Sequence, residues 1–304
     1  MKPADLLLAA AFVVIWGAAF NAARFVVLEW PPFWALAIRF LLTAPLLLAI
    51  ALATRSRMPA PEDRGRVALL GLLGTGGYLA LSWWATALIP SGLVALISAA
   101  TPLVVALGEA AFLGKRPSGL AWIGLALGWA GVALLGGVRL AGQLQDGAGG
   151  HGASEALGVF LALLGAVVQA AGLLVFAPAR GRVDLWSAST GQSLVSVALL
   201  LPLAALFGGP MPTSASTQAW LALAFSVTVV GVGGYALLFV MLRRFTPSTA
   251  AALQLLAPPV AAVIGWAVLN EVLGWADLGG GLLTLAGLSL LFRAQARARQ
   301  AAEG

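Results

Sequence analysis

Long apolar stretches, separated by short segments rich in charge, glycine or proline, fill almost the whole chain. Each is close to the roughly 20 residues that a helix needs to cross the hydrocarbon core of a bilayer. The stretches do not alternate with period two, which disfavours the strands of a membrane barrel. They lie at about 4–27, 32–53, 66–88, 91–113, 118–138, 155–177, 184–207, 217–242, 247–270 and 275–293. We therefore expect an all-α integral membrane protein with ten transmembrane helices.

The composition excludes a soluble protein and several kinds of chemistry. Of the 304 residues, 61% are hydrophobic and 9% are charged, whereas soluble domains carry about 25% charged residues. The chain has no Cys and one His, which excludes disulfides, thiol catalysis and Cys-ligated or multi-His metal sites. We therefore expect no enzymatic activity, no cofactor and no bound metal, and a membrane-embedded enzyme is the least favoured alternative.

The basic residues gather on one side of the membrane that this topology defines. With a cytoplasmic N-terminus, the inner segments hold Lys2, Arg55, Arg57, Arg64, Arg66, Lys115, Arg116, Arg180, Arg182, Arg243, Arg244, Arg293, Arg297 and Arg299. The outer loops hold only Arg24 and Arg139, and Arg39 lies within a span. The positive-inside rule therefore predicts that both termini are cytoplasmic. The net charge of +6 then reflects topology, and we expect no nucleic-acid partner.

The two halves of the chain resemble each other. The sequence Gly-Gly-Tyr at 76–78 recurs at 233–235, and Pro102 has its counterpart in Pro258. We therefore divide the chain into a first five-helix repeat (1–138), an outer Gly-rich linker (139–154), a second five-helix repeat (155–293) and a cytoplasmic tail (294–304). Because five is odd, the second repeat enters the membrane from the opposite side. Such inverted repeats are characteristic of secondary transporters, whose substrate site lies near the midplane between the halves.

A set of short motifs places the chain near a known family. They are Trp16-Gly17 with Phe20, Arg39-Phe40-Leu41, Pro102, Pro258 and Asn270-Glu271. This pattern resembles the EamA-type branch of the drug/metabolite transporter superfamily over nearly the whole chain. One departure is Lys115, which stands where the first repeat is expected to carry an acidic residue; the second repeat keeps Glu271.

The resemblance implies a multi-pass carrier of the bacterial inner membrane that exports small metabolites, including aromatic and other amino acids, by alternating access. The alternatives are a passive channel and a carrier of another small metabolite. The expected partners are a small-molecule substrate and the lipid bilayer. The substrate's identity, the coupling ion and the oligomeric state are left open.

Polar and aromatic side chains at mid-depth are the candidates for substrate contact, because polar groups are costly there. Tyr78 and Tyr235 are repeat equivalents, and each follows Gly-Gly; the alternative is that both only bond backbone carbonyls. Pro102 and Pro258 remove backbone donors near the middle of spans four and nine, where transporter sites are often built. The other candidates are Trp16, Asn21, Ser82, Ser98, Thr101, Gln169 and Gln254. For these, a bond between helices is the alternative.

Two ionisable residues lie inside spans. Arg39 is expected to tie helices together or to reach the outer surface. Glu109 is the one carboxylate well inside a span, so it is the candidate proton carrier, and a bond to a neighbouring helix is the alternative. With so little deep charge, we expect an uncharged or zwitterionic solute.

Spans five and ten carry small residues at helical spacing. These are Gly124, Gly128 and Gly131 in one span and Gly280, Thr284 and Gly287 in the other. Such stripes allow close packing of helices, so we expect these two spans to form scaffold.

Overall fold

The structure is a computed structural model that describes residues 3–112, 114, 117–146, 151–211, 214–244, 253 and 255–303. Within these ranges every regular element is a helix, and nine helices are long and apolar enough to span a membrane. Of the tenth predicted span, 247–270, the described part includes the apolar helix Ala257–Leu269. The prediction of an all-α membrane protein is therefore confirmed.

The first repeat contains five spans in seven α-helices and one π-helix. They are α1 (Pro3–Val27), α2 (Pro32–Ala53), α3 (Pro61–Leu69) with η1 (Leu70–Gly77) and α4 (Tyr78–Leu88), α5 (Ser91–Ser98) with α6 (Thr101–Phe112), and α7 (Gly119–Asp146). The second repeat has α8 (His151–Phe176) with a short η2 (Ala177–Ala179), α9 (Leu185–Phe207), α10 (Thr217–Phe225) with η3 (Ser226–Gly234) and α11 (Tyr235–Arg244), α13 (Ala257–Leu269), and α14 (Trp275–Glu303).

Several helices extend beyond their predicted limits. The third span begins at Pro61 instead of residue 66, because Pro suits the first helical position and the acidic residues Glu62 and Asp63 favour the first turn. In the predicted linker, α7 continues to Asp146 and α8 begins at His151, and residues 147–150 lie outside the described ranges. The predicted tail is also helical, since α14 continues to Glu303.

The third and eighth spans share an unusual feature. Each contains a π-helical segment, η1 or η3, that ends immediately before the tyrosine of the Gly-Gly-Tyr sequence, Tyr78 or Tyr235. π-Helices are rare and occur frequently at functional sites. The repeated sequence is therefore matched by a repeated local structure.

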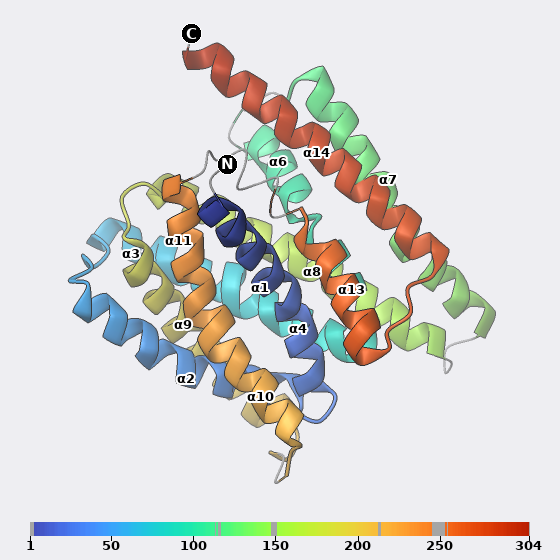
Figure 1. The fold of residues 1–304 in the computed structure, drawn as a ribbon, viewed down its shortest axis with the longest axis horizontal. Helices are drawn as coiled ribbons and strands as arrows, with labels where there is room; N and C mark the ends of the chain where they lie inside the picture. Colours follow the sequence, from blue (N-terminus) through green and yellow to red (C-terminus); the bar gives the residue numbers. More distant parts are fainter. Residues whose placement is uncertain are drawn as a thin grey trace.

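The α7 and α14 helices lie side by side along one edge of the molecule (Figure 1). Their backbones meet at the glycines: a Cβ added to Gly287 would lie 2.7 Å from Gly128 Cα, and one added to Gly131 would lie 2.5 Å from Gly280 O. Any side chain at these positions would separate the helices. The predicted close packing of spans five and ten is confirmed.

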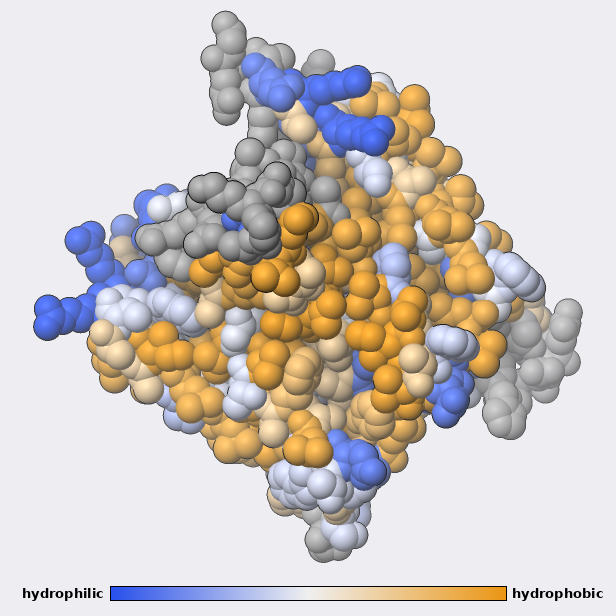
Figure 2. All heavy atoms as spheres, in the orientation of Figure 1, coloured by the Kyte–Doolittle hydropathy of each residue, from blue (hydrophilic) through white to orange (hydrophobic). Residues whose placement is uncertain are grey.

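Both termini lie toward one end of the helical bundle (Figure 1), which we call the terminal face; the loops after α1 and α13 lie on the opposite, far face. Hydrophobic side chains cover most of the visible surface between the two faces, and hydrophilic residues gather at its edges (Figure 2). Within the spans, Val263 and Leu282, for example, are 62% and 69% exposed. Such a surface suits contact with lipid tails.

Candidate substrate cavity

A cavity of about 310 Å³ lies between helices of both repeats. This volume is at the lower end of the range for small-molecule sites, which starts at about 300 Å³. The first repeat contributes residues of α1, α2, η1, α4, α5 and α6, and the second contributes residues of α8, η3, α11, α13 and α14. A cavity of this size, shared by the two halves, suits a small-molecule solute.

Most of the predicted contact residues line this cavity. They are Trp16, Tyr78, Ser82, Ser98, Thr101, Gln169 and Tyr235, together with Arg39 and both prolines, Pro102 and Pro258. Asn21 is buried elsewhere, and Gln254 lies outside the described residues. The described residues thus bring together seven of the nine predicted substrate contacts.

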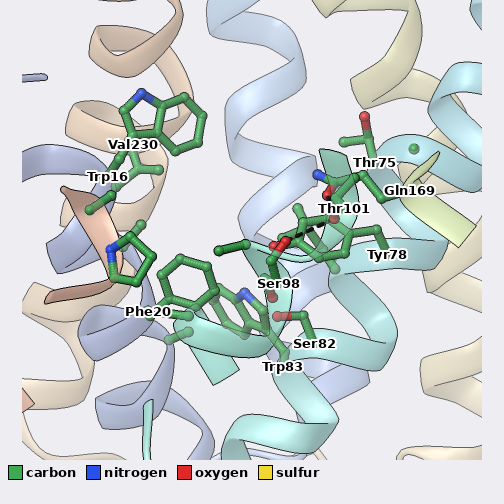
Figure 3. A pocket seen from close by; sticks show the side chains of 18 of the residues that line it. Trp16, Phe20, Thr75, Tyr78, Ser82, Trp83, Ser98, Thr101, Gln169 and Val230 are labelled. Atoms are coloured by element: carbon green, nitrogen blue, oxygen red, sulfur yellow. Dashed lines mark hydrogen bonds between the residues drawn. The ribbon is translucent and has the colours of Figure 1, made fainter. Parts of the chain in front are cut away.

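One side of the cavity, which we call the η1 wall, consists of Thr75, Tyr78, Ser82, Ser98, Thr101 and Gln169. In Figure 3, Thr75, Tyr78, Thr101 and Gln169 lie together on this side. The Thr101 hydroxyl lies 2.8 Å from Gln169 Oε1, and the Thr75 hydroxyl donates to Gln192 Oε1 at 2.7 Å. The η1 wall is therefore neutral, and some of its polar groups already have hydrogen-bond partners within the protein.

A second group of lining residues, on or near η3, consists of Trp16, Arg39, Ser226, Val230 and Tyr235, and we call it the η3 wall. Figure 3 shows Trp16 and Val230 together, away from Tyr78 and Gln169. The Arg39 side chain is 7% exposed, and its Nε donates to the Ser226 carbonyl oxygen at 3.3 Å. Arg39 thus ties α2 to η3. Tying helices together was one of the two roles that the sequence predicted for it.

Several buried polar atoms without a partner belong to residues that line the cavity, and three others, Trp30 Nε1, Trp129 Nε1 and Ser189 Oγ, lie elsewhere. Among the described residues, Trp16 Nε1, Arg39 Nη1 and Ser226 Oγ on the η3 wall and Ser98 Oγ on the η1 wall lack a hydrogen-bond partner. Such atoms are uncommon in folded proteins, and each one calls for an explanation. A polar ligand in the cavity could supply partners to those of these atoms that it reaches.

The predicted helix interruptions lie at the cavity. The α5 helix ends at Ser98 and α6 begins at Thr101, directly before Pro102. In the second repeat, α13 begins at Ala257, directly before Pro258. Because proline lacks an N–H, it fits the first turn of a helix and not its interior.

On the far face, the turn after α13 places the Glu271 carboxylate against the first repeat. Asn270 ends α13 in a left-handed conformation, with φ 54°, which Asn tolerates better than most residues. The Glu271 amide then bonds Gly265 O at 3.0 Å, and its carboxylate lies so close to Gly265 that a Cβ there would collide with it. These contacts hold the Glu271 side chain over the beginning of α5.

Glu271 joins the repeats through what we call the far-face cluster, which consists of Asn21, Arg24, Ser91 and Glu271. The Ser91 amide donates to Glu271 Oε1 at 2.8 Å, and the Ser91 hydroxyl lies 2.7 Å from Oε2. Arg24 Nε lies 3.7 Å from Oε1. A carboxylate is well placed at the positive end of the α5 dipole.

Asn21 belongs to this cluster and not to the cavity lining. Its Nδ2 donates to Gly17 O and Ala261 O, both at 3.2 Å, and its Oδ1 lies 2.9 Å from the Ser91 hydroxyl. Glu109 is half-buried on α6 and does not line the cavity either. Neither residue contacts the cavity in this conformation.

Three contacts were not expected from the sequence. Thr75 and Ser226 line the cavity, but Ser and Thr side chains inside helices usually bond their own helix, so their identity gives little signal. Glu271 was noted as part of a motif without a role. Its position just after a helix end could have suggested a capping partner on another helix.

Comparison with known proteins identifies the family. The sequence profile of the EamA-like transporter family matches residues 4–137 and again residues 156–293. The chain is 26% identical over 280 residues to a protein of Escherichia coli (strain K12) named "Uncharacterized inner membrane transporter YedA", covering 88% of this chain and 85% of the relative. It is 30% identical over 286 residues to a protein of Streptantibioticus cattleyicolor named "Probable terminal-alkyne amino-acid exporter", covering 92% of this chain and 91% of the relative.

The fold also matches a solved crystal structure with a TM-score of 0.61, covering 96% of this chain and 98% of the other at 22% identity. At that identity the likeness concerns the fold alone. The family match, in contrast, extends over both halves of the sequence. The chain therefore belongs to the EamA-like transporter family.

Proposed function

We propose that this transporter exports small metabolites, foremost amino acids including aromatic ones, across the bacterial inner membrane by alternating access. The observation that carries the proposal is a cavity lined by residues of both repeats, in which Trp16, Phe20, Tyr78, Trp83 and Tyr235 supply aromatic surface. Polar side chains on two walls supply hydrogen bonds. Such a lining suits a small amphipathic solute.

The relatives support this choice of substrate. The Streptantibioticus protein is named as an exporter of terminal-alkyne amino acids, which join a polar amino-acid group to an apolar side chain. The cavity of this chain offers the same two kinds of surface. Carriage of a phosphorylated solute is disfavoured because Arg39 is the one cation among the described lining residues.

The distribution of charge supports cytoplasmic termini. Exposed basic residues lie on the terminal face, for example Arg55, Arg57, Arg64 and Arg180. On the far face, Arg24 is paired with Glu271. The positive-inside rule places the face with the surplus of basic residues in the cytoplasm, so the far face is periplasmic in this proposal.

Alternating access requires that the halves separate on one side at a time. The far-face cluster joins the end of α1 and the start of α5, both in the first repeat, to the turn after α13 in the second. Beside it the helices touch, since a Cβ at Gly92 of α5 would lie 2.8 Å from Ala262 Cα of α13. We propose that these contacts close the periplasmic side and break when the cavity opens there.

Uptake into proteoliposomes tests the proposed transport. Purified protein in liposomes is expected to accelerate uptake of labelled phenylalanine or another amino acid over empty liposomes, and the rate is expected to saturate. No acceleration for any of the twenty amino acids would refute the substrate class. Acceleration without saturation would favour a passive channel.

Thiol labelling tests the proposed closure. The chain has no Cys, so Ala95→Cys in the cavity wall would supply the one thiol for a membrane-impermeant reagent added on the periplasmic side. Glu271→Gln removes charge-assisted bonds worth about 1.5–3 kcal/mol each, so labelling is expected to become about tenfold faster. Arg64→Gln, on the terminal face, is the control. An unchanged rate in Glu271→Gln would show that the cluster does not close this side.

A further inference from the structure

We infer that Arg39 binds the carboxylate of the substrate, so that the cavity selects small organic carboxylates over the corresponding amides and amines. The inference deepens the proposed function and rests on its premise that the cavity binds the transported solute. It assigns Arg39 a role in specificity in addition to its contact with η3.

Of the hydrogen-bond donors of Arg39, one has a partner in the protein and another has none. The Nε atom donates to the Ser226 carbonyl oxygen at 3.3 Å and holds the side chain against η3. The guanidinium carbon lies 5.9 Å from the centre of the Trp83 ring. Nη1 has no partner although it is buried. The side chain thus lines the cavity, is held in place by Nε, and keeps part of its hydrogen-bonding capacity unused.

Electrostatics points to an anion as that molecule. Arginine stays protonated in proteins, and a buried cation is strongly unfavourable unless an anion approaches it. Among the described residues, Arg39 forms no ion pair, and the described lining of the cavity contains no Asp or Glu. The undescribed stretch 245–252 contains no acidic residue in its sequence. The Phe40 and Trp83 rings, with centres 4.9 and 5.9 Å from the guanidinium carbon, offset part of the cost of burying this cation. Neither ring carries a negative charge, so an anionic solute would supply the balancing charge.

The neighbours of Arg39 suit a carboxylate. Ser226 Oγ and Trp16 Nε1 belong to the same wall and also lack partners. All three groups can donate a hydrogen bond, and an ionised carboxylate accepts up to about four. An ammonium group would find neutral oxygens and aromatic rings but no acidic partner among the described lining residues. The carboxylate, and not the amine, is therefore the group that the cavity selects.

The first experiment uses the unmodified protein and a matched pair of probes. Calorimetry in detergent compares 3-phenylpropionate with 3-phenylpropionamide, which differ in charge and hardly in size. A hydrogen bond to a charged group changes affinity by about 10- to 100-fold, so the carboxylate is expected to bind at least about tenfold more tightly. Equal affinities would overturn the inference without any change in the protein.

The second experiment assigns the selectivity to Arg39. In Arg39→Gln the carboxylate-to-amide ratio is expected to fall to about one, whereas Arg39→Lys, which keeps a point charge, is expected to keep a preference for the carboxylate. Arg64→Gln, the same substitution outside the cavity, is expected to leave the ratio unchanged. If Arg39→Gln does not elute as folded protein, Arg39→Lys decides: its carboxylate-to-amide ratio is expected to fall below that of the unmodified protein but to stay above one, because a point charge replaces the planar fork of donors. An unchanged ratio in Arg39→Lys would then overturn the inference. A preference that persists undiminished in folded Arg39→Gln would overturn the inference.

The binding and transport experiments can fail separately. If the carboxylate preference depends on Arg39 but no amino acid is transported, the inference holds and the proposed substrates are wrong. If amino acids are transported while 3-phenylpropionamide binds as well as 3-phenylpropionate, the proposed function holds and the inference is wrong.

Discussion

The two π-helical segments occupy equivalent positions in the repeats but present different chemistry to the cavity. Beside η1 lie Thr75, Thr101 and Gln169, which are neutral and bonded to other side chains. Beside η3 lies Arg39, a buried cation with an unpartnered nitrogen. Local structure is thus conserved between the halves while polarity is not. A cavity with one neutral and one cationic wall is expected to hold its solute in one orientation, carboxylate toward η3.

Two glycines at these segments differ in how closely they are packed, and this difference gives the largest expected effect. A Cβ at Gly172 of α8 would lie 2.7 Å from Gly74 Cα in η1, whereas a Cβ at Gly233 in η3 would meet only Thr228 O, at 3.6 Å. Gly172→Ala is therefore expected to lose about 1–3 kcal/mol through overpacking. Gly233→Ala is expected to be neutral or to gain roughly 0.5–1 kcal/mol. The thermal midpoints and the yields of folded protein in detergent measure the stability of both variants. Equal losses of stability in the two variants would contradict the packing difference.

The tyrosines that follow the two segments test whether both walls contact the solute. Tyr78→Ala and Tyr235→Ala are expected to lower the transport rate by about tenfold, the effect of losing 1.4 kcal/mol of binding, while expression is unaffected. The substitutions Tyr78→Phe and Tyr235→Phe keep the ring and remove the hydroxyl, so they separate the contributions of these two groups to transport. An equal loss of folded protein and of transport would show that the tyrosines serve packing alone.

The hydrogen bonds of the η1 wall allow a smaller test. Thr101→Val removes the link from α6 to Gln169 of α8, and Thr75→Val removes the link from η1 to Gln192 of α9. Each bond between membrane helices contributes about 1 kcal/mol, so each variant is expected to lower the thermal midpoint by a few degrees. The carboxylate preference at the η3 wall should persist. If either variant abolished it, the two walls would not act separately.

The smallest effect is expected where the eighth span begins. Glu29 accepts hydrogen bonds from the amide and hydroxyl of Ser216, which caps α10, and these bonds hold the pKa of Glu29 below its ordinary value of 4.5. A lowered pKa means that the contribution to stability is present above the unfolded pKa and is lost as the pH falls through the folded pKa. The thermal midpoints of the unmodified protein and Glu29→Gln should differ slightly at neutral pH and converge below pH 4.5. If the difference between the two thermal midpoints grew as the pH was lowered, the predicted direction of the pH dependence would be contradicted.

The sequence was sufficient for the spans and for part of the cavity. The spans could be predicted because the length of an apolar stretch is a local property of the sequence. The internal repeat placed Tyr78 and Tyr235 at equivalent depths in the membrane. Asn21 was misplaced because depth does not say which way a side chain points around its helix. It faces α13 and Ser91, and that depends on the close approach of helices at Gly17.

Other features depend on contacts between distant parts of the chain. Ser91 and Glu271 meet across 180 positions, which no local pattern predicts. The sequence could not show whether Arg39 has an acidic partner, because that depends on which residues pack around it in the fold. The π-helices were also missed, because their sequences contain no signal beyond the glycines that the repeat had already brought out.

Counterflow tests most directly the central claim that one cavity between the two repeats opens alternately to either side. Proteoliposomes loaded with unlabelled phenylalanine, or with whichever amino acid the uptake assay identifies, receive the same labelled amino acid outside. The account predicts transient accumulation of label above its equilibrium level and faster entry than into unloaded vesicles. Entry that is proportional to external concentration and indifferent to the internal solute would contradict it.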